Sequence, residues 1–393
     1  MGLLTDPSAG QGKLVKALLK HYSKLCVLLY LGGIIWFCSI AHPAINSKTY
    51  FSENALLPGL VKSHFYGDEM ISMFYNELSD EMTKYDDSIP YPWLLAKFKQ
   101  IGLDSYTHNF TLHSPLAKKE KYSGKNIYGI LRAARSSSTE AIILSAPYRP
   151  PVSVHPTTAP SIAVMLAFAK YANTKKYWAK DIIFLITEHE QLGIQAWLEA
   201  YHGVSCGHEN ILDHGDLRGR AGAIQAAVNL ELHSQEIGQI DLKIEGLNGQ
   251  LPNLDLFNLV SKMCGKEGVY QTFKNVIRRS YDEPTAIDDI FPKDTSMEKW
   301  SVTINNSILQ IPNGNHGLFH RFGIQALTLE GFQESVAGKG AKKGLVNIGR
   351  IIEGTFRSLN NLLERFHQSF FFYLLPSSDR YISIGRYIFL CKM

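Results

Sequence analysis

The stretch from Asp181 to Tyr201, DIIFLITEHEQLGIQAWLEAY, limits the possible folds of this chain more than any other. Its apolar run predicts a buried strand over Asp181–Ile186, and apolar residues at helical spacing predict a helix over Gln195–His202. Because α/β folds bind ligands at the carboxyl ends of their strands, the acidic turn between these elements is a candidate site. There Glu188 is either a metal ligand, base or polar anchor, or a hydrogen-bonded turn residue, and the next two residues either join it or begin the helix.

The rest of the chain alternates between helical and strand-like patterns. Helices are expected over Asp68–Asp86, Trp93–Ile101 and Ser161–Ala172. Strands are expected over Tyr106–Leu112, Asn126–Leu131, Ala141–Ser145, Ala221–Leu232 and Ile324–Leu329. The polar segment 274–315 is expected to form loops at the sheet edge. Strands separated by helices predict an α/β fold, a mostly parallel mixed sheet covered by helices on both faces.

Composition excludes several classes of protein. With 393 residues, 45% of them hydrophobic, the chain has enough apolar side chains for one large core or two modest ones. The net charge is only +4 and the basic residues form no long run, so no nucleic-acid partner is expected. The five cysteines lack CxxC or Cys/His metal spacing, which argues against zinc-finger and thioredoxin-like sites.

The N-terminal region contains an uncharged segment long enough to span a bilayer. Leu25–Ala41 has 17 residues without a charge, and several lysines precede it. These features predict a cytosolic tail at 1–24, a transmembrane anchor at 25–42 and a membrane-proximal lumenal segment at 43–68. A cleaved signal peptide and a buried core helix are the alternatives.

Two sequons and two cysteines also bear on the compartment. Asn109 and Asn305 are each the first residue of an Asn-x-Ser/Thr sequence, which together with the anchor favours a lumenal or extracellular body. In such an oxidising space Cys206 and Cys264 either form a disulfide or remain two free thiols.

Polar residues at three strand ends are similar in order to the zinc sites of M28-type aminopeptidases. They are residues 146–149, the turn at Glu188, and Glu231, followed by His316 before the last strand. The resemblance implies an aminopeptidase-like domain over 69–343. Two zinc ions in such a site need about five imidazole and carboxylate ligands.

Two turns of this chain depart from that pattern. Pro147 stands where the resemblance implies a histidine ligand, and Arg149 stands where it implies an aspartate. Thr157 and Thr158 supply no acid in the approach to the next helix. His155 is either a substitute ligand or a solvated loop residue. A cation in place of a carboxylate opposes zinc binding, so no metal cofactor is expected.

The remaining positions keep only part of the pattern. Aligning Gly193 with a glycine of the aminopeptidases puts Glu188 at a ligand position and Thr187 at that of the general base. Glu231 matches an aspartate ligand, and His316 matches a substrate-side histidine. We therefore expect no hydrolysis by the parent mechanism, because neither the metal-activated water nor its base is present. Glu188, Glu231 and His316 are interpreted as remnants of a catalytic site.

Long segments carry a second resemblance, which covers nearly the whole chain. They are Met1–Leu4, Thr49–Tyr50, Ser52–Ala55, Tyr177–Leu185, Ala196–His202, Arg218–Ala227, Glu245–Leu256 and Leu362–Phe371. In these segments the chain resembles the anchor-attachment subunit of the glycosylphosphatidylinositol (GPI) transamidase, a membrane complex of the endoplasmic reticulum. The resemblance implies a non-hydrolytic subunit that brings the GPI lipid to a separate cysteine-protease-like catalytic subunit, with further membrane subunits as partners. Where that family continues into more membrane helices, this chain has only a short hydrophobic segment, 369–393, and looks truncated.

The same resemblance directs attention to residues near the membrane plane. Tyr50 and Ser52 follow the predicted anchor closely, and we expect them to contact the GPI headgroup, with ordinary linker structure as the alternative. An amphipathic helix is expected over Leu345–Phe366, within a segment 344–368 that lies either on the sheet or on the membrane. Glu353, near its middle, is a candidate polar contact for phosphoethanolamine or a cation.

Two other functions are compatible with the sequence. In the first, Glu188, Glu231 and His316 hold a single metal ion and the lumenal domain itself forms or hydrolyses an amide bond. In the second, the chain is an unrelated adhesion or receptor ectodomain.

Overall fold

The computed structural model describes most of the chain. The described residues are 19–40, 47–85, 88–113, 121–135, 139–207, 211–273, 276–277, 314–334, 342–366, 372–377 and 380–385. Asn305 and nearly all of the polar segment 274–315 lie outside them.

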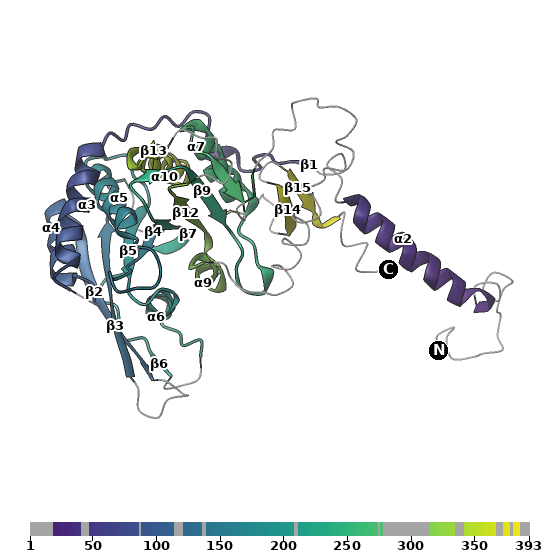
Figure 1. Cartoon of the computed structure of the whole chain (residues 1–393), viewed down its shortest axis with the longest axis horizontal. Helices are drawn as coiled ribbons and strands as arrows, with labels where there is room; N and C mark the ends of the chain where they lie inside the picture. The colour runs from purple at the N-terminus through teal and green to yellow at the C-terminus, as the bar shows by residue number, and fades with distance from the viewer. Residues whose placement is uncertain are drawn as a thin grey trace.

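A 10-stranded mixed sheet forms the centre of the fold (Figure 1). Its order is β11-β10-β9-β12-β7-β4-β5-β3-β2-β6. The strands are β2 (Asp104–His113), β3 (Lys121–Leu131), β4 (Glu140–Pro147), β5 (Asp181–Thr187), β6 (Leu212–Asp213), β7 (Ala223–Leu232), β9 (Gln239–Lys243), β10 (Gln271–Phe273), β11 (Val276–Ile277) and β12 (Gln325–Phe332). The four neighbours β12, β7, β4 and β5 are parallel, and antiparallel pairs flank them on both sides. The predicted mixed sheet is confirmed, with its parallel part at the centre.

The central strands are buried on both faces. All residues of β5 are buried, and so are all residues of β4 except the first. Along β4, Ile142 and Leu144 belong to one apolar cluster, whereas Ala141 and Ile143 belong to the other. Since successive side chains of a strand point to opposite faces, a continuous apolar strand requires helices on both of them.

Helices cover both faces of this sheet. The larger cluster contains α3 (Asp68–Met82), α4 (Tyr91–Ile101), α5 (Ala159–Asn173), α7 (Leu254–Lys266) and α10 (Leu345–Asn360). The cluster on the other face contains α6 (Gln191–His202) and α9 (His316–Arg321). The helices expected from the sequence are present, whereas α7 and α9 were not predicted.

The amphipathic helix near the C-terminus belongs to this domain. α10 ends at Asn360, six residues before the predicted end at Phe366. Ile348, Ile352 and Phe356 are buried, and the helix packs against α5 and α7. Of the two locations that the sequence left open, the structure has the one on the domain, because its apolar face is used in the core.

At the N-terminus, α2 (Tyr22–Ile40) is a helix with exposed apolar residues. A membrane-spanning helix needs about 20 predominantly apolar residues. Within the described ranges no helix is both long and apolar enough to cross a membrane. Residues 41 and 42 of the anchor predicted at 25–42 lie outside the described ranges.

Short strands bring the two ends of the domain together. β1 (Ser47–Lys48), β15 (Arg380–Ser383) and β14 (Tyr373–Ser377) form an antiparallel sheet in that order. The hydroxyl of buried Tyr373 donates to the carbonyl of Pro252 at 2.7 Å, which fastens this sheet to the domain. Where the structure describes the C-terminal segment 369–393, it therefore contains strands and not a second membrane helix. The remaining short elements are β8 (Glu236–Ile237) with β13 (Lys343–Gly344), η1 (Asn54–Leu56) and η2 (Leu247–Gly249).

Two buried carboxylates fasten the segment after β1 to the domain. Asp255, in the first turn of α7, accepts hydrogen bonds from the backbone amides of Ser52 and Glu53 at 2.7–3.1 Å. Glu353 of α10 accepts from the amides of His64 and Phe65 at 2.7 and 2.9 Å. Because buried N–H groups need a partner, these carboxylates hold the segment on the surface of the domain.

Replacing Glu353 by alanine should destabilise the fold, since several buried donors lose their acceptor. We expect a loss of about 2–5 kcal/mol in the free energy of unfolding. Denaturant unfolding measures this loss, and the exposed Glu69→Ala on α3 serves as the control. Equal effects of the two substitutions would contradict the assigned role of Glu353.

Candidate functional site

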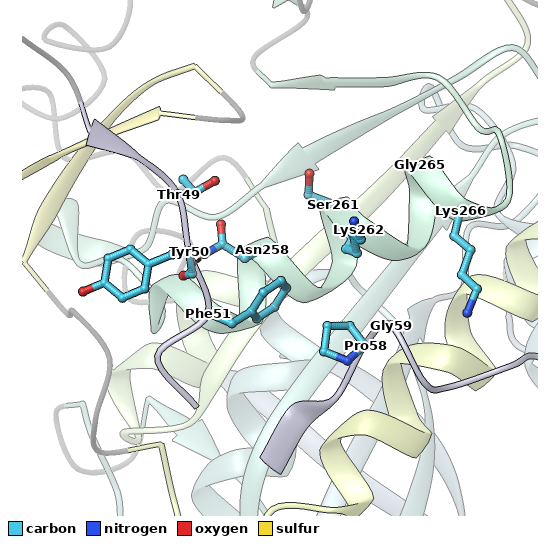
Figure 2. Close-up of a pocket in the computed structure, with 10 residues that line it drawn as sticks. All are labelled: Thr49, Tyr50, Phe51, Pro58, Gly59, Asn258, Ser261, Lys262, Gly265 and Lys266. Atoms are coloured by element: carbon cyan, nitrogen blue, oxygen red, sulfur yellow. Dashed lines mark hydrogen bonds between the residues drawn. The ribbon is translucent and has the colours of Figure 1, made fainter. Parts of the chain in front are cut away.

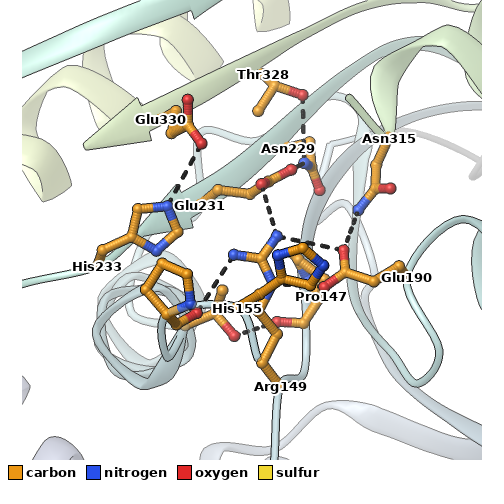
Figure 3. Close-up of polar contacts among 12 residues, drawn as sticks. Pro147, Arg149, His155, Glu190, Asn229, Glu231, His233, Asn315, Thr328 and Glu330 are labelled. Atoms are coloured by element: carbon orange, nitrogen blue, oxygen red, sulfur yellow. Dashed lines mark hydrogen bonds and ion pairs between the residues drawn. The ribbon is translucent and has the colours of Figure 1, made fainter. Parts of the chain in front are cut away.

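A network of charged side chains lies at the carboxyl ends of the parallel strands (Figure 3). At its centre lies Arg149, which follows β4 and is only 9% exposed. Its guanidinium donates to Glu190, which follows β5, and its Nη2 atom lies 3.0 Å from Oε2 of Glu231 in β7. Buried charges of opposite sign attract strongly because water screens them little. One cation therefore ties together the ends of three neighbouring strands.

The turn after β5 has a strained backbone that brings Glu190 to Arg149. His189 and Glu190 both have positive φ angles, 58° and 50°. For residues other than glycine this region costs on the order of 1–3 kcal/mol each. The ion pair with Arg149 offsets part of this strain. The sequence leaves open whether Glu190 joins Glu188 in the site or begins the next helix. The opposite charges of Glu190 and Arg149 are the sequence feature that indicates their ion pair.

A chain of hydrogen bonds leads from Glu231 to His316. Asn229 donates to Oε1 of Glu231 at 2.9 Å and to the hydroxyl of Thr328 at 3.2 Å. The Thr328 hydroxyl lies 2.9 Å from Nδ1 of His316, whose Nε2 atom lies 2.9 Å from the carbonyl of Glu245. A carbonyl only accepts, so Nε2 carries the proton and Nδ1 accepts from Thr328. Two of the predicted remnant residues thus belong to one network.

The third predicted residue, Glu188, serves a different purpose. Its carboxylate accepts hydrogen bonds from the backbone amides of Ile89 at 3.1 Å and Lys125 at 2.7 Å. Gly193 is required beside it, because an added Cβ atom would lie only 2.1 Å from the carbonyl oxygen of Glu188. Of the two roles open from the sequence, Glu188 has that of a hydrogen-bonded turn residue.

Glu231 and two further residues come close to the geometry of a metal site. Glu231, His233 and Glu330 offer ligand atoms within 4.8 Å of one another, the one such group among the described residues. Arg149 already neutralises Glu231, and the ammonium of Lys243 lies 2.7 Å from Glu330. Because these two cations balance the two carboxylates, a divalent ion would have to displace one of them. The observed arrangement does not fit a metal centre.

Burial controls the protonation of the network. It raises the pKa of the Glu231 carboxyl, although the charge of Arg149 opposes the shift. Burial disfavours the charge of Arg149, but hydrogen bonds and attraction from Glu190 and Glu231 outweigh it and raise the pKa of Arg149. Burial, with a smaller contribution from His320, holds the pKa of His316 well below its ordinary value. His316 is therefore neutral at neutral pH.

A separate pocket lies on the surface between α7 and the segment after β1 (Figure 2). Its volume is about 650 Å³. Tyr50, half exposed, lies at one end of it and Lys266 at the other (Figure 2). The lining residues are Thr49, Tyr50, Phe51, Pro58, Gly59, Asn258, Ser261, Lys262, Gly265 and Lys266. Hydroxyl and ammonium groups together suit a ligand with sugar and phosphate oxygens.

Three further candidate residues, Ser52, Glu353 and Asn109, lie outside the Arg149 network. The amide of Ser52 is bound by Asp255, next to this pocket. Glu353 is fully buried and bonded to the 63–65 segment and to Tyr171, so its carboxylate is not open to a headgroup. Asn109 is exposed on β2, as a glycosylation site must be.

Two alternatives left by the sequence are also decided. Cys206 and Cys264 are free thiols, and burial raises the pKa of Cys264 to about 12. His155 lies in an exposed loop, as expected of a solvated residue.

These observations define an α/β protein whose strand-end crevice is closed by ion pairs and whose open pocket lies elsewhere, on α7. Residues 123–391 match the family model described as Gaa1-like, GPI transamidase component. The chain belongs to this family.

Two sequence relatives match nearly the whole length of this chain. The chain is 30% identical over 385 residues to the GPI transamidase component gaa1 of Schizosaccharomyces pombe, covering 94% of this chain and 62% of that protein. It is 30% identical to GAA1 of Saccharomyces cerevisiae, covering 95% and 55%. The chain therefore spans about three fifths of the length of these relatives.

Similar solved structures include a glutaminyl cyclase of Fimbriiglobus ruber, with 13% identity, a TM-score of 0.48 and coverage of 79% of this chain and 98% of that one. The LapA aminopeptidase of Legionella pneumophila has 12% identity, a TM-score of 0.44 and coverage of 77% and 78%.

Replacing Arg149 by alanine should destabilise the protein and expose the latent metal ligands. It leaves Glu231 buried without its cation, which we expect to cost about 3–5 kcal/mol of unfolding free energy. Added zinc should restore part of the melting temperature in Arg149→Ala and have no such effect on the unchanged chain. Arg149→Ala combined with His233→Ala is the control, which should lose the zinc effect. The assignment fails if zinc stabilises all three proteins equally.

Stability should fall as the pH drops below about 6.5, the ordinary pKa of histidine. The pKa of His316 is lower in the folded protein than in the unfolded chain, so the unfolded chain takes up the proton first. The stability is therefore present in full above pH 6.5 and decreases below it. His316→Gln should reduce the slope of unfolding free energy against pH between about 5 and 6.5. The exposed His155→Gln should leave the slope as it is.

Proposed function

We propose that this chain is a non-hydrolytic subunit of the GPI transamidase, which recruits and presents the GPI lipid for attachment to proprotein C-termini. Membership of the Gaa1-like family supports the assignment to that complex. The partners are then the other subunits, including a cysteine-protease-like catalytic subunit, and the location is the endoplasmic reticulum with the main domain in the lumen. The exposed sequon at Asn109 supports the lumenal side.

The state of the crevice supports a role without catalysis in this chain. Arg149 occupies the space between Glu190 and Glu231, and Thr187, at the expected position of a general base, is a buried residue without an acidic group. A metal-activated water needs both free ligands and a base. The alternative of a single metal on Glu188, Glu231 and His316 has no support, because Glu188 is bonded to two backbone amides and Nε2 of His316 to a carbonyl.

The pocket on α7 is the observation that carries the lipid-presenting role. It is open, lies beside Tyr50 and the backbone held at Ser52, and contains Lys262 and Lys266. A GPI headgroup consists of sugars, phosphodiesters and ethanolamine, so hydroxyl, aromatic and ammonium side chains match its chemistry. Tyr50 and Ser52 remain our proposed headgroup contacts.

Replacing both Tyr50 and Ser52 by alanine should reduce the amount of GPI that co-purifies with the complex. The substitutions remove the aromatic ring of Tyr50 beside the pocket and the hydroxyl of Ser52. We therefore expect roughly a tenfold loss of retained lipid, equivalent to about 1.4 kcal/mol. The matched control is Tyr66→Ala, another exposed tyrosine. Unchanged GPI retention in the double variant would refute the headgroup contact.

Membership of the complex itself is tested by affinity purification from membranes, followed by identification of the bound proteins. We expect the transamidase subunits to be recovered with this chain. Recovery of none of them would refute the proposal, and glycans processed beyond the high-mannose form would place the chain at the cell surface instead.

A further inference from the structure

The turn at residues 57–60, Leu-Pro-Gly-Leu, exposes apolar side chains although buried sites lie directly beside it. Leu57 is 47% exposed and Leu60 is 75% exposed. Their neighbours Leu56 and Val61 are buried in the main apolar cluster. The chain thus reaches the core immediately before and after the turn, while both leucines at its ends face outward.

The turn is held in a fixed and strained shape. The amide of Leu60 donates to the carbonyl of Leu57 at 3.0 Å. Leu57 has a left-handed backbone, with φ 41° and ψ 48°, which is costly for a residue other than glycine. Asp255 fastens the chain before the turn, and Glu353 fastens it after the turn. A strained backbone conformation that the surrounding structure holds in place is typical of functional segments.

Exposed lysines surround these leucines. Pro58 and Gly59 line the same pocket as Lys262 and Lys266, as Figure 2 shows. Lys266 donates to the carbonyl of Val61, so the basic face of α7 lies directly beside the turn. Lys62 is exposed one residue further along. Lys262 and Lys266 are four residues apart on one helix, an arrangement of like charges that a bound anion stabilises.

We infer that the 57–60 turn and the lysines beside it form a contact surface for a lipid bilayer with anionic headgroups. Leucines between lysines match the boundary of a bilayer, where apolar side chains enter the acyl region and ammonium groups meet phosphates. This inference rests on the proposed function for its membrane setting. It adds a lipid-binding surface next to the headgroup pocket, so that a lipid held in the pocket would keep its tails in the bilayer.

Tryptophan placed at position 60 tests the contact directly. Leu60→Trp in the full chain is reconstituted into vesicles whose lipids are brominated in their acyl chains, and its fluorescence is compared with that of the parent chain. We expect the added fluorescence to be quenched in vesicles that contain phosphatidylserine. Quenching should decrease several-fold in pure phosphatidylcholine, at high salt, and in a chain that also carries Lys62→Glu and Lys262→Glu.

The control is Val154→Trp, a fully exposed position in the loop after β4, which should not be quenched. Circular dichroism confirms that each variant is folded. The inference is overturned if Leu60→Trp is unquenched, or if Leu60→Trp and Val154→Trp are quenched equally. The vesicles contain no GPI and no other subunit, so such a failure is distinct from a failure of the headgroup contact.

Discussion

The ion pairs of Arg149 are the interaction on which the centre of this fold depends. A guanidinium buried between Glu190 and Glu231 joins the ends of β4, β5 and β7, and it does so only because the turn after β5 accepts a strained backbone. The carboxylates of Glu190 and Glu231, at the ends of β5 and β7, would otherwise repel each other where water screens them poorly. The guanidinium of Arg149 supplies the positive charge that balances these two carboxylates.

The same principle recurs where the chain enters the domain. Asp255 and Glu353 are buried acids, and each accepts hydrogen bonds from consecutive backbone amides of the segment after β1. Buried charges are tolerated when they are fully bonded, and they become rigid ties as a result. The acidic residues that suggest chemistry in the sequence therefore mainly serve structure, and the open polar surface lies instead on α7.

Much of the fold could be predicted from local patterns. The strand predicted over 181–186, the helices predicted over 68–86, 161–172 and 195–202, and the mixed sheet follow from periodicity, because each buried element repeats apolar residues at its own spacing. The structure has these elements with ends that differ by a few residues. The site was harder to predict. Glu188 and Glu190 lie in one acidic turn but have different roles. Glu188 accepts hydrogen bonds from backbone amides, whereas Glu190 forms an ion pair with Arg149. This difference depends on the backbone torsion angles of the turn and on the position of Arg149, which the sequence does not show. α7 was not recognised, although its residues line the pocket.

By itself, the sequence determined the α/β class, the presence of Pro147 and Arg149 at the end of a predicted strand, and the resemblance to GPI transamidase subunits. Residue identity and local periodicity can be read along the chain. Only the tertiary structure decided which groups meet. It paired Arg149 with two acids, buried Glu353 in the domain, and brought Tyr50 into the same pocket as Lys262 and Lys266, although about 200 residues of chain separate them. Such contacts depend on strand order and helix packing, which no local pattern encodes.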